Sequence, residues 1–143
     1  MIKQHTHDYR DINFRTFTVS VSLLGVTAST ASNYSVFFTA HRPCELIRIV
    51  ESHQAPGTGA GAVTLDIFKL TGTQDPDTGG VSMLASTFNL KSTANTIVEG
   101  TLTTTRRDRI LAKNNRITLK DSGTLSSVGG LNVVLEFLLL DNI

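Results

Sequence analysis

Residues 54–72 read QAPGTGAGAVTLDIFKLTG, and the order of glycines and apolar residues in this stretch decides the fold. The glycine-rich segment 57–61 looks like the phosphate loop of a nucleotide-binding enzyme, which requires a helix directly after the glycines. The residues after the glycines have a strand pattern instead, because Val63, Leu65 and Ile67 alternate with polar residues at a two-residue period. The chain also lacks the Gly-Lys-Ser or Gly-Lys-Thr triplet of a Walker loop. We therefore interpret the glycines as a flexible loop that joins two strands.

The same two-residue period recurs along most of the chain. Short apolar segments are separated by turns rich in Gly, Pro, Asn, Asp and Ser, and the polar stretch 91–96 has room for one helical turn. About eight short strands without helical connections exclude a parallel βαβ sheet and favour two antiparallel sheets packed face to face. The predicted fold is therefore an all-β antiparallel sandwich of the jelly-roll type. The predicted strands cover residues 17–23, 34–40, 46–50, 63–70, 83–90, 97–103, 117–120 and 131–139.

One face of the first strand and one face of the last strand should form the core. Alternate residues point to the same side of a strand, and on these two strands one side is wholly apolar. The predicted core residues are Leu131, Val133, Leu135, Phe137 and Leu139, together with Phe17, Val19, Val21 and Leu23.

Two strands are also apolar on the side that faces away from this core. On the strand after the glycine loop these residues are Phe68 and Leu70, and on the last strand they are Val134, Leu138 and Leu140. A single sandwich would leave such faces in contact with water, so we expect a second subunit to cover them in a homotrimer.

The sequence predicts that the first fifteen residues, 1–15, form an extended polar arm ahead of a single sandwich domain, which covers residues 16–143. The arm mixes both charge signs, and its apolar residues are too sparse to form a core of their own. We expect the arm to gain order by docking on a neighbouring subunit or another partner, whereas the alternative is a free tail without a role. The candidate contact residues of the arm are Tyr9, Arg10, Ile12 and Phe14.

The composition is that of one folded domain, with 143 residues, 40% hydrophobic and 17% charged. The net charge of +1 lacks the basic excess of a protein built to bind nucleic acid, so no specific nucleic-acid partner is expected. Cys44 is the single cysteine, which excludes an intrachain disulfide and favours a small buried apolar role. The N-terminal residues lack the apolar segment of a secretory signal, and the apolar segment 133–140 is too short to span a bilayer. We expect synthesis in the cytoplasm and no membrane partner.

The sequence contains no residues with the spacing of a catalytic or metal site. His5, His7 and Asp8 resemble a ligand set, but a further rigidly held ligand is missing. His41 and His53 stand at opposite ends of a strand with glutamates nearby, and we interpret them as scattered residues. A Gly-x-Ser-x-Gly elbow and a Cys–His arrangement are both absent from the sequence. We therefore expect no enzymatic activity, no metal and no cofactor.

The charges are distributed unevenly, and the segment 106–121 is basic. One interpretation is an electropositive edge that docks on an acidic protein surface, and the other is a solvated hairpin whose charges prevent edge-to-edge pairing. Single-stranded nucleic acid is a weaker third interpretation, because no aromatic stacking groups are interleaved with the basic residues. The basic residues are Arg106, Arg107, Arg109, Lys113, Arg116 and Lys120, against the acidic Asp108 and Asp121.

Residues 33–140 resemble a group of small virion proteins of tailed bacteriophages, of the head decoration or structural type. The resemblance lies in the succession of strands and turns: the strand at 34–40, then GAVTLDIFKLTGT, STFNLKSTANTIVEGTLT and RILAKNNRITLKDSGTLSSVGGLNVVLEFLLL. Where members of this group tend to have Ala-Gly-Asp before the penultimate strand, this chain has Lys113, Asn114 and Asn115. Asparagine also forms turns, so this departure is compatible with the same fold.

This resemblance implies a non-enzymatic jelly roll that binds the outer surface of the capsid, as a trimer, and cements or decorates it. The implied partners are the major capsid protein and further copies of the chain itself, and the implied location is the virion. On this interpretation the arm and the basic segment are the candidate capsid contacts. Two alternatives stay open: a receptor-binding or structural domain of a phage tail fibre or spike, and a small hydrolase or lyase on the same sandwich.

Overall fold

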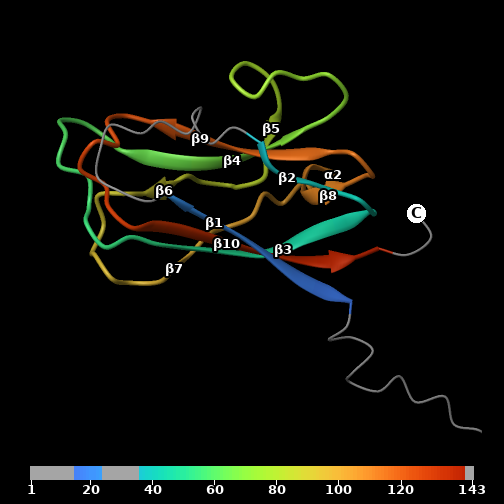
Figure 1. Cartoon of the computed structure of the whole chain (residues 1–143), viewed down its shortest axis with the longest axis horizontal. Coiled ribbons are helices and arrows are strands. Elements are labelled where there is room, and N and C mark those ends of the chain that lie inside the picture. The colour runs from blue at the N-terminus through green and yellow to red at the C-terminus, as the bar shows by residue number, and fades with distance from the viewer. Residues whose placement is uncertain (1–14, 24–35, 141–143) are drawn as a thin grey trace, which may run out of the picture.

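The computed structural model describes residues 15–23 and 36–140 and shows a two-layered β-structure (Figure 1). The leading arm, apart from Arg15, lies outside these residues. The elements are β1 (Thr16–Leu23), β2 (Val36–Thr39), β3 (Cys44–Ser52), β4 (Thr64–Leu70), β5 (Val81–Ser82), β6 (Phe88–Asn89), β7 (Val98–Glu99), α2 (Arg106–Arg109), β8 (Ile110–Leu111), β9 (Arg116–Ser122) and β10 (Leu131–Leu139).

The strands form two antiparallel sheets that face each other. One sheet has the order β1-β10-β3-β7, with β8 also pairing with β3, and the other has the order β2-β9-β4-β5, with β6 also pairing with β4. β5 and β6 both pair with β4, and β7 and β8 both pair with β3, so each of these couples counts as one interrupted strand. With this count, the chain crosses from one sheet to the other at nearly every connection, as in a jelly roll. The all-β sandwich prediction is confirmed.

β10 occupies the middle of its sheet and supplies the largest share of the core. It pairs with β1 along one edge and with β3 along the other, so its inward residues meet side chains from both neighbours. The inward residues Leu131, Val133, Leu135 and Phe137 are buried, as predicted, whereas Leu139 at the strand end is partly buried. The β1 residues Phe17, Val19 and Val21 pack against this core and are partly buried, and the side chain of Leu23 lies outside the described part.

Three phenylalanine rings connect the sheets at one end of the sandwich. The ring of Phe137 stacks on Phe17 of β1 and on Phe38 of β2, with centroid distances of 5.2 Å in both cases. Stacking at this distance adds a favourable electrostatic term to the burial of three large rings. Phe137 is therefore the side chain through which β1, β2 and β10 are held together.

The outer face of the second sheet differs from the expectation at one residue. Leu70 is fully buried within the chain, with Gly80 at the end of the loop 71–80 against its side chain, and it is therefore not available for a subunit interface. Arg116 holds this loop by donating hydrogen bonds from Nη2 to the carbonyls of Gly72 (3.0 Å) and Gln74 (2.8 Å). Gly80 closes the loop with φ +95°, and a Cβ there would lie 2.9 Å from the Lys69 carbonyl oxygen.

The remaining outward apolar residues are only partly covered. Phe68 is half-buried, with Lys120 Nζ 5.6 Å from its ring centroid, and Val134, Leu138 and Leu140 are half-buried as well. A cation over an aromatic face gives this outer surface a mixed character rather than a purely apolar one.

The connections differ from the sequence prediction in two places. The helical turn lies at 106–109 and not in the stretch 91–96, which forms hydrogen-bonded turns. The segments 83–90 and 97–103 are also less regular than predicted: they contribute two-residue strands and an isolated bridge between Leu84 and Leu102. The strand propensity of these two segments does not decide their structure, because the chain crosses from one sheet to the other between them.

We predict that Phe137→Ala lowers the free energy of unfolding by about 3–5 kcal/mol, because it leaves a cavity between two stacked rings. Chemical denaturation measures this loss. Leu138→Ala on the outward side of the same strand is the matched control and should cost clearly less. Equal losses for the two variants would contradict the assigned register.

Candidate functional site

The structure separates the predicted contact residues into three groups. Tyr9, Arg10, Ile12 and Phe14 lie outside the described residues. Phe68 is half-buried on the outer face of the second sheet, and the arginines of α2 form the third group.

The three arginines of α2 have different surroundings. Arg106 Nε donates to Glu45 Oε1 of β3 at 2.6 Å, which ties α2 to the neighbouring sheet. Arg107 has 88% of its side chain exposed and its Nε lies 3.7 Å from Asp108 Oδ1, and Arg109 is half-buried. Of the three, Arg107 is therefore the most accessible to a partner, although Asp108 offsets part of its charge.

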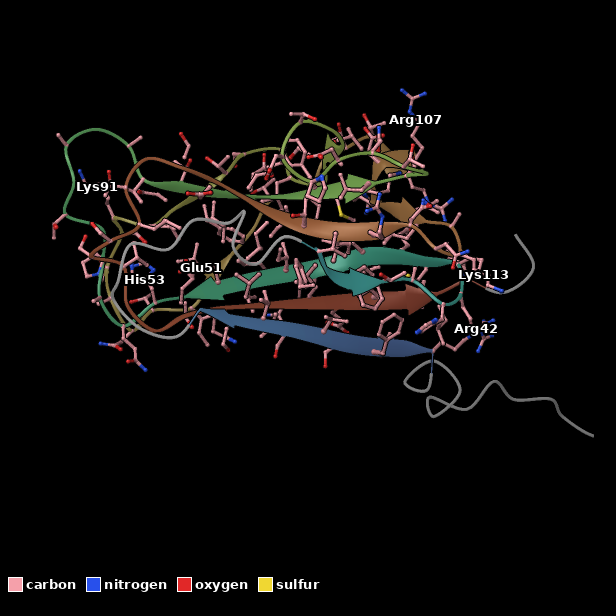
Figure 2. All side chains as sticks on the ribbon, turned by 45° about the horizontal axis from the view of Figure 1, so that its top comes forward. Arg42, Glu51, His53, Lys91, Arg107 and Lys113 are labelled. Atoms are coloured by element: carbon pink, nitrogen blue, oxygen red, sulfur yellow. The ribbon has the colours of Figure 1, made fainter. Side chains whose placement is uncertain are left out.

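Further basic residues lie at the same end of the sandwich. Arg42 in the turn between β2 and β3 and Lys113 in the turn between β8 and β9 are exposed, and Figure 2 shows both toward the end that carries Arg107. The two turns are joined by backbone hydrogen bonds, from Asn114 N to Ala40 O (2.7 Å) and back from Ala40 N to Asn115 O (2.8 Å). We call the surface formed by Arg42, Arg107 and Lys113 the basic end.

Lys69 holds α2 in place from inside the sandwich. Its side chain occupies an inward position of β4 and is buried, and its Nζ donates to the carbonyls of Arg107 (2.6 Å) and Ile110 (3.0 Å). Burial lowers the pKa of Lys69, against the opposing attraction of Asp108. The sequence carries a signal for this role, because a lysine that shares a strand face with Leu65 and Ile67 must find acceptors inside the fold.

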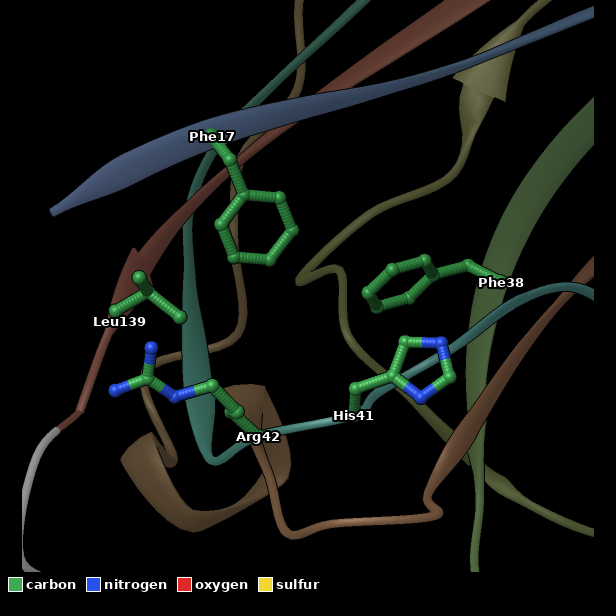
Figure 3. Close-up of a pocket in the computed structure, with 5 residues that line it drawn as sticks. All are labelled: Phe17, Phe38, His41, Arg42 and Leu139. Atoms are coloured by element: carbon green, nitrogen blue, oxygen red, sulfur yellow. The ribbon is translucent and has the colours of Figure 1, made fainter. Parts of the chain in front are cut away.

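A pocket of about 130 Å³ opens beside the basic end, lined by Phe17, Phe38, His41, Arg42 and Leu139 (Figure 3). Its walls are the rings of Phe17 and Phe38 and the side chain of Leu139, while His41 and Arg42 stand at its rim. The wall residues are only half-buried, although they continue the core. Such a pocket fits an apolar side chain next to an acidic group.

A buried acid–base pair lies toward the opposite end, where Figure 2 shows Glu51 and His53. His53 Nδ1 is 2.6 Å from Glu51 Oε1, and both side chains are fully buried. His53 Nε2 donates to the Ser92 carbonyl at 2.9 Å, so the other ring nitrogen shares a proton with the carboxyl group. Our interpretation of His53 as a scattered residue was therefore wrong, because His53 directly follows β3 and its ring contacts the carboxyl group of Glu51, two residues earlier.

Both members of this pair have raised pKa values. Burial raises the pKa of Glu51, although its hydrogen bond to His53 acts in the opposite direction. Burial alone would lower the pKa of His53, but the hydrogen bonds to Glu51 and to the Ser92 carbonyl outweigh it and raise the pKa. Neither side chain of the pair is exposed, so the pair belongs to the interior of the sandwich.

Other reactive groups are sparse in the described ranges 15–23 and 36–140. Within them, no cluster of three or more His, Cys, Asp or Glu side chains is placed to hold a metal ion. Cys44 is buried, and desolvation raises the pKa of its thiol to about 11. No helix in the same ranges is long and apolar enough to cross a membrane.

Comparison with known proteins gives a structural likeness. No protein-family model and no curated protein matches the sequence. Among solved structures, a chain in the capsid of Ralstonia phage GP4 superimposes with a TM-score of 0.58 over 89% of this chain and 86% of that chain, at 11% sequence identity. The two chains share a fold. The likeness covers both sheets rather than one motif, since it extends over nearly the whole of each chain.

We predict that Lys69→Met destabilises the protein by about 1–3 kcal/mol, because it leaves the carbonyls of Arg107 and Ile110 without their buried donor. Denaturation measures the loss, and hydrogen exchange should report faster opening of α2. Lys91→Met is the matched control, since Lys91 Nζ also donates to two carbonyls, of Gly59 (2.8 Å) and Gly61 (2.9 Å), but at an exposed site. A loss for Lys91→Met as large as for Lys69→Met would contradict this role of burial.

We predict that the stabilising effect of the Glu51–His53 pair decreases as the pH rises. Both pKa values are raised, so the folded state binds more protons than the unfolded state above their ordinary values of 4.5 and 6.5. The stability that His53 contributes is complete below pH 6.5 and is lost as the pH rises through its folded pKa.

The measurement compares the free energy of unfolding of the natural chain and of Glu51→Gln between about pH 6 and about pH 9. The difference between the two should shrink toward high pH. For Glu99→Gln, whose carboxylate pairs with Arg48 at an exposed site, the difference from the natural chain should stay constant. A constant difference for Glu51→Gln as well would disprove proton sharing in the pair.

Proposed function

We propose that the chain is a non-enzymatic structural protein of a tailed-bacteriophage virion, which binds the outer surface of the capsid and stabilises it. The observation that carries this proposal is the fold shared with a chain of a phage capsid over nearly the whole of both molecules. A decoration or cement role suits a small sandwich whose charged groups at one end are available to a partner while its buried acid–base pair is closed to solvent.

The proposed contact with the major capsid protein is the basic end. Arg107 and Lys113 are exposed, with Asp108 Oδ1 3.7 Å from Arg107 Nε. Hydrogen bonds from Lys69 and between Arg106 and Glu45 hold α2 in place. A charged surface on a fixed support loses little side-chain and backbone freedom on docking. Complementary acidic groups on the capsid would increase the association rate and set the orientation.

The chain is further proposed to act as a homotrimer. The half-buried residues Phe68, Val134, Leu138 and Leu140 lie on the outer faces of the two sheets, and a neighbouring subunit would remove them from water. Leu70 is no longer part of this surface, since it is fully buried against the end of the loop 71–80.

The proposal is tested by titrating the protein onto capsids that lack it and measuring occupancy by electron microscopy. The natural chain should decorate the capsid surface, and the double variant Arg107→Glu with Lys113→Glu should reduce occupancy at least about 10-fold at moderate salt. Lys91→Glu, at the opposite end of the sandwich, is the matched control and should bind as the natural chain does.

A chain lacking residues 1–12 separates the contribution of the arm from that of the basic end. If the shortened chain occupies fewer capsid sites while the double variant binds as the natural chain does, the arm and not the basic end is the capsid contact. If the protein binds the tail and not the capsid, the decoration role is wrong and the chain is a domain of a tail fibre or spike.

A further inference from the structure

We propose that His53 is a protonation-dependent latch, which holds the segment 91–96 against the end of β3 and releases it when the Glu51–His53 pair loses its shared proton. The latch is the imidazole ring itself, because it bridges two groups that are distant in sequence. Nδ1 lies 2.6 Å from Glu51 Oε1, and Nε2 lies 2.9 Å from the carbonyl oxygen of Ser92. The inference is independent of the proposed capsid role, since it concerns the free chain in solution.

Both ring nitrogens of His53 face oxygen atoms, and this determines how many protons the site must hold. The Ser92 carbonyl oxygen only accepts, so Nε2 carries a hydrogen. A second hydrogen lies between Nδ1 and Glu51 Oε1, because two lone pairs 2.6 Å apart would repel each other. A neutral imidazole has a single N–H, so beside an ionised Glu51 it can donate to only one of the two oxygens. Loss of the shared proton therefore breaks one of the two contacts.

The contact with Ser92 is the one that breaks. Glu51 lies inside β3, where it is paired with β10 on one side and with β7 on the other. The segment 91–96 consists of turns between β6 and β7, and its conformation places Asn95 at φ +57°, in the left-handed region. Turns on the surface open at a lower free energy than strands that are paired on both sides. Deprotonation should therefore release the segment and leave β3 in place.

Two buried polar atoms reduce the cost of this release. Glu51 Oε2 and Ser92 Oγ are buried, and neither has a hydrogen-bond partner among the described residues. Opening of the segment lets both atoms reach water, which offsets part of the free energy lost at the ring. The segment is also attached by the hydrogen bond from Asn95 N to the His53 carbonyl at 2.7 Å. The Asn95 amide is therefore a direct reporter of opening.

The strands on either side of Glu51 place no further charge against the pair. Its partners across the sheet are Val133 of β10 and Val98 of β7, which are both apolar. The next residue of β7, Glu99, forms an ion pair with Arg48 at an exposed site. The protonation of the latch is therefore set by burial and by the contacts of the pair itself.

The charged residue of the segment is Lys91, and it connects the latch to the glycine loop 57–61. Its Nζ donates to the carbonyls of Gly59 (2.8 Å) and Gly61 (2.9 Å) at an exposed site, so its charge is directed to that loop. Release of the segment 91–96 should therefore also loosen the glycine loop.

The test is amide hydrogen exchange of the full chain between about pH 6 and about pH 9, with each rate divided by the intrinsic rate of that amide at the same pH. The protection of the Asn95 amide should fall at least about 10-fold over this range, as expected for the loss of a hydrogen bond to a charged group. The Gly79 amide is the matched control, because it donates to the Asp75 carbonyl over the same 2.7 Å in another loop. Its protection should stay constant, and so should that of the β10 amides, which report global unfolding.

Two variants separate the latch from an ordinary contact. Glu51→Gln presents an amide that donates to Nδ1, so a neutral His53 can still donate from Nε2 to the Ser92 carbonyl. In this variant the Asn95 amide should stay protected up to the highest pH. Ser92→Ala keeps the carbonyl and removes only the unpaired hydroxyl group, so it should retain the pH response of the natural chain.

Three results would overturn the proposal. The first is a protection of Asn95 that does not change with pH in the natural chain. The second is a parallel loss of protection in β10, because the pH would then act on the whole fold and not on the segment 91–96. The third is a pH response of Glu51→Gln equal to that of the natural chain, because a group outside the pair would then control the opening.

Discussion

The packing of β10 between β1 and β3, with its inward side chains against the other sheet, is the interaction on which the rest of the molecule depends. Phe137 is fully buried and stacks on rings from β1 and β2, so one residue fixes the distance between the two sheets at that end. The turns that carry Arg42 and Lys113 start from strands positioned by this contact. The basic end and the pocket are thus products of the core rather than independent loops.

The polar groups inside the sandwich show how the second constraint, hydrogen-bond satisfaction, is met. Lys69, Glu51 and His53 occupy inward positions, and each makes at least one hydrogen bond inside the fold, although Glu51 Oε2 is buried without a hydrogen-bond partner. A polar group without any partner at one of these positions would lower the free energy of unfolding by at least as much as a lost hydrogen bond does. Two of the pairings have a structural result: Lys69 fixes α2, and His53 fixes the segment at Ser92.

The sequence predicted the sandwich, the longer strands and the inward face of β10, because alternation along a strand is a local property that survives folding. The segments 83–90 and 97–103 form only two-residue strands and one bridge instead of the predicted full strands. The sequence did not predict that Leu70 is buried, since the adjoining loop 71–80 is held by Arg116, a residue distant in sequence. Glu51 and His53 are two residues apart at the end of β3 and just beyond it, but the sequence does not show the Ser92 carbonyl from another segment that completes their arrangement. Pockets and charged ends arise from several segments at once, so a pattern within one segment does not contain them.

The pairing of β1 with β10 also sets the order in which the molecule can form. Thr16 pairs with Leu138 and Phe17 with Phe137, so this edge of the sheet closes across more than about 100 residues of intervening chain. During synthesis β1 emerges long before its partner exists and carries an apolar face without a neighbour. Folding should therefore be slow relative to that of a helical protein of equal size, and the interval before β10 appears is the period of greatest risk of aggregation. The serine and threonine residues that alternate with Phe17, Val19 and Val21 keep this early segment half polar, which reduces its tendency to associate with other nascent chains.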